Sequence, residues 1–400
     1  MSRKIHKTIS DKAEQLHDNV INTRRHFHMH PELPGEEKET SRYVAEKLSE
    51  LGLEVQANIG GYGVVGILKG ANHGVDIAWR ADMDACAIQD EKDVPYKSKV
   101  DGVMHACGHD AHTAIALGIA EVLSSVKEHL SGTVKFIFQP WEEGSKGALA
   151  MINDGVLDNP YPSAIYGLHQ GSLGANQTYM EAGKLSLHYG TVLFGSDKLD
   201  INVKADNSMN NLWALQERLV FMLNRINRYD IKQRKRDIHN LINFQILAKA
   251  SNDETGEIIL SAQFRYAMQE YRDEIRGELS HIIDDFSRLY NAEASIGYTT
   301  SLPPVYNDEA DCKEAEKILW DLLGENLIII SDEVPPHGTD DFSLFQYALS
   351  GLFFFLGSAN LNRGLKGANH TSVFDIDEEC LTFGIKTMSA FLYEVLERRA

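Results

Sequence analysis

Stretches of buried-strand and helix character alternate through the first half of the chain. Short apolar runs bounded by polar residues predict strands at 63–68, 75–79, 134–139 and 164–168. Between two of them, Ile115, Ile119, Val122 and Leu123 recur at helical spacing and predict an apolar helix face. A further helix is expected within 36–53, with Gly52 as its stop. This alternation predicts an α/β layer architecture with a central mixed sheet.

The pattern changes after about Tyr189. Two strand candidates, 199–203 and 257–266, are interleaved with helix-prone segments at 212–226 and 271–289. Buried-strand character returns at 351–356, and an amphipathic helix follows through 381–395. We therefore expect a main domain in two parts, 1–188 and 299–400, split by a smaller inserted α+β domain at 189–298.

Composition narrows the classes of partner and compartment. A chain of 400 residues with 43% apolar residues can bury a sizeable core, and a formal net charge of −19 repels nucleic acid and anionic membranes. The first residues show no apolar signal region, and no run of about 18 apolar residues occurs. We expect a cytoplasmic protein with no membrane or nucleic-acid partner. The four cysteines include no CxxC pair, so a cysteine with a special role is expected to be a ligand or a nucleophile rather than part of a disulfide.

Metal-ligand side chains follow the predicted strands. Asp82 and Asp84 follow the second strand, Glu142 and Glu143 the third, and His169 ends the fourth. The cluster HACGHDAH, from 105 to 112, precedes the Ile115 helix. Because ligands bind at the carboxyl ends of the strands in open α/β sheets, we expect these groups to meet.

The mixture of side chains indicates the kind of ion. Thiolate, imidazole and carboxylate together suit zinc or a neighbouring divalent transition metal better than calcium or magnesium. Adjacent glutamates diverge, so one of Glu142 and Glu143 can bind metal while the other takes a proton from water. A solvated acidic loop is the alternative for such a pair, and the preceding apolar strand and Pro140 favour the functional interpretation.

Seven sequence blocks resemble the dinuclear-zinc aminoacylase and carboxypeptidase family, in the branch with hippurate hydrolase, N-acyl-amino-acid amidohydrolases and auxin-conjugate hydrolases. They are RRHFHMHPELPGEE at 24–37, WRADMDA at 79–85, MHACGHDAH at 104–112, FQPWEEG at 138–144, GLH at 167–169, GTDDFS at 338–343 and NHTSVFDID at 369–377. The blocks occur in the family's order. The resemblance implies a catalytic main domain with an inserted ferredoxin-like lid and dimerisation domain.

The resemblance also implies a role for each matching residue. Cys107 would be shared by two metal ions, His109 and His169 would complete one site, and Glu143 and His370 the other. Glu142 would be the general base. Asp82 and Asp84 would hold the ligands in place without binding metal. For His28, His105 and His112 we expect packing or capping roles, and Asp340 and Asp341 are candidates for shaping the substrate site.

The expected activity is hydrolysis of an amide or peptide bond in a small N-acyl-amino acid or short peptide. Two divalent ions per chain are expected, zinc first and manganese second. The resemblance further implies a homo-oligomer, a dimer or tetramer, formed through the inserted domain.

The inserted domain departs from the family. A Gly-Gly-His signature whose histidine stabilises the oxyanion is expected after its first strand, but the stretch KADNSMN at 204–210 has neither the glycine pair nor the histidine. Asn207, Ser208 and Asn210 are candidate replacement donors beside Met209, and His239 is another.

Two other classes of protein fit part of the sequence. A non-catalytic metal-binding relative, acting as a scaffold or binding module, would explain the altered lid but not an unliganded Glu142. A cysteine hydrolase with Cys107 as nucleophile would leave Glu143, His169 and His370 unexplained. Both are weaker than the metal-dependent hydrolase.

Overall fold

The computed structural model describes residues 2–171, 180–205, 211–228, 242–252, 254–331, 338–365 and 369–399. The chain forms two compact units, of which the first comprises 1–190, 306–333 and 340–400, and the second 191–305 and 334–339. Thus the second unit is inserted into the first. The sequence analysis placed the insertion at 189–298, and these boundaries stay a prediction.

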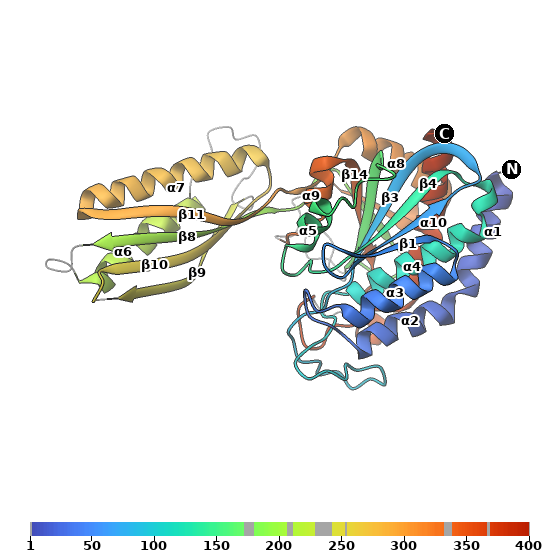
Figure 1. Ribbon diagram of the computed structural model, residues 1–400, viewed down its shortest axis with the longest axis horizontal. Coiled ribbons are helices and arrows are strands. Elements are labelled where there is room, and N and C mark those ends of the chain that lie inside the picture. The colour runs from blue at the N-terminus through green and yellow to red at the C-terminus, as the bar shows by residue number, and fades with distance from the viewer. Residues whose placement is uncertain are drawn as a thin grey trace. The chain divides into compact units, whose positions relative to one another are not determined.

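The first unit contains one eight-stranded mixed sheet (Figure 1). Its order is β1-β2-β4-β3-β5-β14-β6-β13, and β3 runs parallel to both β4 and β5. The strands are β1 Glu54–Ile59, β2 Gly63–Lys69, β3 Asn72–Asp82, β4 Ser131–Gln139, β5 Ala164–Gly171, β6 Leu185–His188, β13 Ile328–Ser331 and β14 Ser350–Gly357. The four strands predicted before residue 170 correspond to β2, β3, β4 and β5, so the α/β class with a mixed sheet is confirmed.

Helices cover both faces of this sheet because successive strand residues point to opposite sides. On β14, Phe353 contacts Phe342 of α9, whereas its neighbour Phe354 contacts Phe391 of α10. The helices are α1 Ser2–Gln15, α2 His17–Met29, α3 Lys38–Glu50, α4 His109–Ser125, α5 Gly147–Asn153, α8 Glu309–Leu323, α9 Phe342–Ala348 and α10 Glu379–Arg399, with short 3₁₀ turns at Lys127–His129, Glu325–Leu327 and Leu361–Arg363. Gly52 follows α3 with φ +79°, as expected of a helix stop.

The second unit has a βαββαβ order. Its antiparallel sheet, β11-β8-β10-β9, carries helices α6 and α7, which is the ferredoxin-like arrangement predicted for the insertion. Its elements are β8 Gly195–Ala205, α6 Leu212–Leu223 with a 3₁₀ turn at Asn224–Arg228, β9 Ile242–Asn252, β10 Glu257–Tyr266, α7 Gln269–Tyr290 and β11 Ala292–Leu302. Strands β7 Gly190–Leu193 and β12 Val305–Asn307 lie where the chain passes from one unit to the other.

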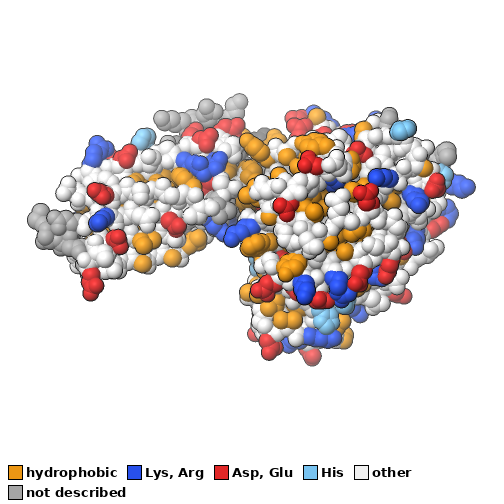
Figure 2. Space-filling model, viewed as in Figure 1, with side chains coloured by type: hydrophobic (Ala, Val, Ile, Leu, Met, Phe, Trp, Pro, Cys, Tyr) orange, Lys and Arg blue, Asp and Glu red, His pale blue; other side chains and the backbone are white. Residues whose placement is uncertain are grey.

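Charged side chains are spread over the surface. Figure 2 shows acidic and basic side chains interspersed over the visible face of both units. Among the described residues, none of the helices combines the length and apolar character that a membrane crossing requires.

Candidate metal centre

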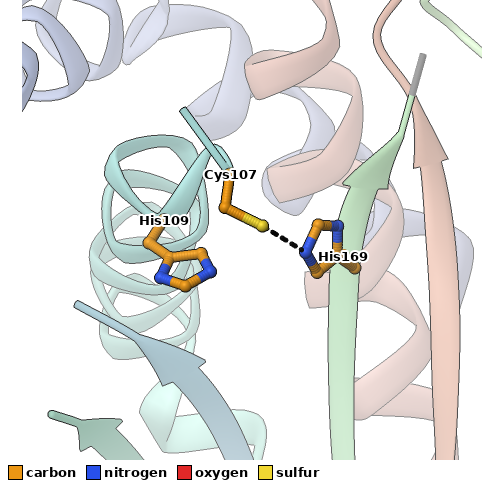
Figure 3. Close-up of side chains that lie close together, drawn as sticks. All are labelled: Cys107, His109 and His169. Atoms are coloured by element: carbon orange, nitrogen blue, oxygen red, sulfur yellow. Dashed lines mark hydrogen bonds between the residues drawn. The ribbon is translucent and has the colours of Figure 1, made fainter. Parts of the chain in front are cut away.

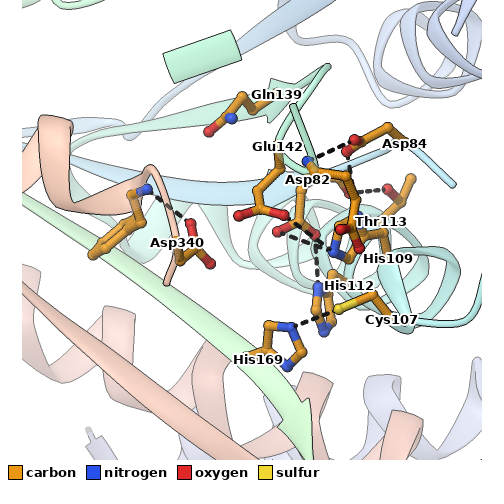
Figure 4. A network of polar contacts seen from close by, with 12 residues as sticks. Asp82, Asp84, Cys107, His109, His112, Thr113, Gln139, Glu142, His169 and Asp340 are labelled. Carbon is orange, nitrogen blue, oxygen red and sulfur yellow. Dashed lines mark hydrogen bonds and ion pairs between the residues drawn. The ribbon is translucent and has the colours of Figure 1, made fainter. Parts of the chain in front are cut away.

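The carboxyl ends of three adjacent strands bring the candidate side chains together (Figure 4). β3 ends at Asp82, β4 ends just before the Glu142–Glu143 pair, and His169 lies near the end of β5. α4 begins at His109, directly after Cys107 and Gly108. Gly108 has φ +89°, and a Cβ there would lie 2.3 Å from Nε2 of Gln170, so the turn between thiol and imidazole requires glycine.

Cys107, His109 and His169 form the first ligand group (Figure 3). The Cys107 Sγ lies 3.4 Å from Nε2 of His169. Burial raises the pKa of the Cys107 thiol, but His169 and His109 outweigh burial and lower this pKa to about 5. The sulfur is therefore prepared to act as a thiolate ligand. His109 Nε2 is buried without a hydrogen-bond partner among the described residues, which leaves this lone pair available for a cation.

Glu143 and His370 form a second group with Cys86. The Glu143 Oε1 lies 3.0 Å from His370 Nε2 and 3.1 Å from Cys86 Sγ. Burial raises the pKa of Glu143, but the hydrogen bond with His370 and the charge of His109 lower it to about 2. Hydrogen bonding with Cys107, and next with Glu143, raises the pKa of His370 to about 10. The His370 side chain is 54% exposed, so this imidazole is open to solvent.

The two glutamates diverge because the backbone turns sharply before them. Trp141 has φ +61°, and its backbone N–H donates to Oε1 of Glu37 over 2.8 Å. Glu143 consequently faces His370, whereas Oε2 of Glu142 lies 3.9 Å from Nε2 of His109. Burial raises the pKa of Glu142 well above its ordinary value, and the nearby Asp340 and Asp341 raise it further. A carboxyl group with a raised pKa suits general acid–base chemistry.

Asp82 and Asp84 contact the imidazole rings and the glutamate loop. Asp84 Oδ1 lies 3.3 Å from His109 Nδ1, and its Oδ2 accepts a hydrogen bond from the Glu143 backbone N–H. Asp82 Oδ1 lies 2.6 Å from Nδ1 of His112. His112 Nε2 accepts the backbone N–H of Gln170, so the proton of this ring sits on Nδ1. Such contacts orient rings next to a metal.

Arg80, which had no role in the sequence-based prediction, contacts three of the carboxylates at the site. Its guanidinium is buried and lies 2.6 Å from Asp82, 3.1 Å from Asp340 and 3.3 Å from Asp341. Burial raises the pKa of Asp341 to about 7, although Arg80 lowers it. The sequence could have indicated this role, because Arg80 directly follows an apolar strand and a buried cation needs carboxylate partners. Asp340 and Asp341 therefore line the Glu142 side of the site.

Two other family histidines lie apart from the ligand groups. His28 is buried between Asp110 and Asp90, with ring nitrogens at 2.7 and 3.3 Å. His105 is also buried, and burial lowers its pKa to about 3, so its ring is neutral. The lid residues Asn207, Ser208, Met209, Asn210 and His239 lie outside the described residues.

The donor set fits divalent transition-metal ions. Two of the groups in which three ligand atoms lie within 4.8 Å of one another contain the expected ligands. Cys107, His109 and His169 offer a sulfur and two imidazoles, and Glu143, His370 and Cys86 offer a carboxylate, an imidazole and a sulfur. The buried His109 Nε2, which has no hydrogen-bond partner within the described parts of the chain, is an independent sign that this group suits a cation. Soft and borderline ligands of this kind favour zinc and its neighbours.

Comparison with known proteins adds a family. The model of "Peptidase family M20/M25/M40" matches residues 78–394. IAA-amino acid hydrolase ILR1-like 4 of Arabidopsis thaliana is 32% identical over 387 residues, covering 93% of this chain and 84% of that protein. Thermostable carboxypeptidase 2 of Saccharolobus solfataricus is 30% identical over 399 residues, covering 94% and 95%.

A solved structure agrees with the same assignment. The Bacillus subtilis YXEP protein, a dinuclear metal binding peptidase from the M20 family, superposes with a TM-score of 0.81 at 29% sequence identity and covers 96% of this chain and 99% of its own. The family resemblance found in the sequence is thereby confirmed. Because the family model and full-length relatives match a chain that gathers metal-ligand side chains at its strand ends, the protein belongs to peptidase family M20/M25/M40 and is a metal-dependent hydrolase of carbon–nitrogen amide bonds.

Proposed function

We propose that the protein hydrolyses the amide bond of N-acyl-amino acids or short peptides with two divalent metal ions, zinc in the first place, and Glu142 as general base. Cys107, His109 and His169 would hold one ion, and Glu143, His370 and the shared Cys107 the other. Support comes from the two ligand groups and from the dinuclear metal binding of the similar YXEP protein. Asp82 and Asp84 would orient the ligands.

The observation that carries the role of Glu142 is the divergence of the glutamate pair. Glu143 contacts His370, while Glu142 faces His109, Asp340 and Asp341. When bound, the cations supply an acidified water and polarise the substrate carbonyl. Glu142 then takes the proton of the attacking water and returns it to the leaving amine. Its raised pKa, set by burial and the two aspartates, suits the second of these transfers.

Paired glutamine variants test these roles. Glu142→Gln keeps the shape of the side chain, so it should retain both ions while turnover falls about 10²–10⁴-fold. Glu143→Gln should instead lower metal content, because an amide is a poorer ligand than a carboxylate. Metal analysis and turnover are measured on the same preparations. Equal metal loss in both variants would show that the roles of the two glutamates are misassigned.

The bridging role of Cys107 has its own test. Cys107→Ala should lower occupancy at both sites together, because one sulfur serves both ions. Metal analysis by mass spectrometry provides the measurement. A variant that kept two ions and full turnover would contradict the shared ligand and would equally exclude Cys107 as a nucleophile.

Two kinds of amide are candidate substrates. One similar protein is an IAA-amino acid hydrolase and another a carboxypeptidase. Because the lid lacks the expected histidine, and loss of one oxyanion donor typically lowers turnover about 10²–10³-fold, we infer weak activity on simple N-acyl-amino acids and a preference for peptides with further contacts. A panel of N-acetyl amino acids and dipeptides decides this. Fast hydrolysis of N-acetyl amino acids that survives replacement of every lid donor, His239 included, would refute the inference.

Two further properties belong to the proposal. Self-association through the inserted domain, as a dimer or tetramer, follows from the family resemblance, and light scattering coupled to size-exclusion chromatography measures it. A cytoplasmic location stays an expectation of the sequence analysis.

A further inference from the structure

Cys86 lies next to the second ligand group in a rigid backbone setting. Its N–H donates to the Met104 carbonyl over 2.9 Å, and the Met104 N–H donates back over 3.1 Å. The segment after Met104 leads to Cys107, and the His370 N–H donates to the carbonyl of Ala106 in the same segment over 2.8 Å. The backbones of Cys86 and His370 are therefore both fixed to the segment that carries the shared thiol.

The Cys86 side chain points at the proposed ligands. Its sulfur lies 3.1 Å from Oε1 of Glu143, and that oxygen lies 3.0 Å from Nε2 of His370. One ligand atom from each of the three residues falls within 4.8 Å of the others. Zinc–ligand bonds of about 2.0–2.3 Å in a tetrahedron separate neighbouring ligand atoms by about 3.3–3.8 Å. Small side-chain movements are enough to surround an ion.

We propose that Cys86 is a metal ligand that completes the Glu143–His370 site. The inference rests on the proposed dinuclear centre. The Cys86 thiol loses its proton to solvent as the sulfur binds the ion. With Glu143, His370, the shared Cys107 and Cys86, this ion has four protein ligands and no open position, as in structural zinc sites.

The proposal divides the work between the two ions. The ion held by Cys107, His109 and His169 has three protein ligands and keeps an open position for water, as catalytic zinc sites do. Glu142 lies on that side, 3.9 Å from His109. The general base therefore faces the open ion, and the closed ion anchors the Glu143 loop.

The competing explanation is a thiol that only donates a hydrogen bond to Glu143. Cys86→Ser separates the two, because a hydroxyl still donates to a carboxylate but is a poor ligand for these metals. Cys86→Ala removes both properties. Cys312→Ser is the matched control, since Cys312 is also buried but lies in α8.

The first experiment titrates metal-free full-length protein with Co²⁺ and follows cobalt–thiolate charge-transfer absorption together with stoichiometry. In wild type and Cys312→Ser, both equivalents of Co²⁺ should add thiolate absorption. In Cys86→Ser and Cys86→Ala alike, the absorption should decrease and the weaker-bound equivalent should lose affinity about tenfold or more. Absorption and affinity that stay at the wild-type level in Cys86→Ser would overturn the proposal.

X-ray absorption spectroscopy of the unaltered zinc protein provides the second measurement, which does not depend on a variant folding. A shared Cys107 alone gives about 1.0 sulfur neighbour per zinc, and an added Cys86 gives about 1.5. A value near 1.0 with two bound ions would exclude Cys86 while leaving the dinuclear centre intact. Wild-type protein that binds one ion, or none, would instead refute the proposed centre itself.

Discussion

Replacement of Arg80 by methionine should destabilise the catalytic unit strongly. The guanidinium is buried at the end of β3, where it contacts Asp82, Asp340 and Asp341 and donates from Nε to Gln139 over 2.9 Å. Methionine has a similar volume but no charge, so Arg80→Met leaves these carboxylates without their cation and creates little cavity. The effect measured is therefore electrostatic.

The expected magnitude follows from the burial of both partners. Breaking a buried ion pair by removing one partner typically lowers stability by about 3–5 kcal/mol, because the remaining charge is desolvated and unpaired. Since about 1 kcal/mol shifts the melting temperature by about 2–4 °C in a large domain, the variant should melt roughly 6–20 °C lower. Arg42→Met is the control: its ion pairs with Glu39 and Glu46 are exposed to solvent, so their loss should leave the melting temperature nearly unchanged.

Tryptophan fluorescence during urea unfolding can isolate the relevant unit. Trp79, Trp141 and Trp320 belong to the first unit, and Trp213 belongs to the inserted one, so a Trp213→Phe background reports the catalytic unit alone. Asp340→Asn added to Arg80→Met should restore part of the loss. A loss of less than about 1 kcal/mol in the free energy of unfolding for Arg80→Met would refute the stabilising role of Arg80. A double variant that recovers none of the loss would refute its pairing with Asp340.

Three further outcomes are expected. Gly108→Ala should lower stability by at least about 1 kcal/mol and displace Gln170, since the position combines φ +89° with a 2.3 Å approach; unchanged urea midpoints would contradict this. Burial raises the pKa of Glu37 to about 7, so the folded protein binds this proton more tightly than the unfolded chain and loses stability as the pH rises from about 4 to 7. Over that range, Glu37→Gln should gain about 1–3 kcal/mol of stability relative to wild type in urea unfolding. A difference between variant and wild type that does not change with pH would exclude the titration of Glu37 as its cause. His112→Phe should weaken metal binding about 10–100-fold in chelator competition because it frees Asp82, and wild-type affinity would argue that His112 only fills space.

The fold was predictable where hydrophobic periodicity is strong. The apolar runs of β2 to β5 and the predicted strand at 351–356 correspond to strands in the structure. The edge strands β9 and β11 were missed because their alternation is diluted by small and polar residues, as in Ala292, Ala294 and Ile296. Edge strands contact one neighbour, so fewer of their positions need to be apolar.

The sequence predicted which types of ligand gather at the strand ends. It did not predict which residues contact and position them. Sequence spacing says nothing about which distant chain segment supplies a partner, so it could not place Asp340 beside Arg80 or Cys86 beside His370. The carboxylate of Glu37 is separated from Trp141 by more than a hundred positions, yet it fixes the turn that separates the two glutamates. Such contacts become visible only in three dimensions.

The position of β14 has a consequence for biosynthesis. β14 lies between β5 and β6, and β6 pairs only with β13 and β14 among the described strands, both of which are synthesised after the insertion. The four strands of the ferredoxin-like unit are synthesised before β14. During this time one edge of β5 lacks its partner strand, and an unpaired edge is prone to mispairing. His370 also emerges after this point. With His370 as a ligand, as proposed above, the second metal site is completed only after most of the chain has been synthesised.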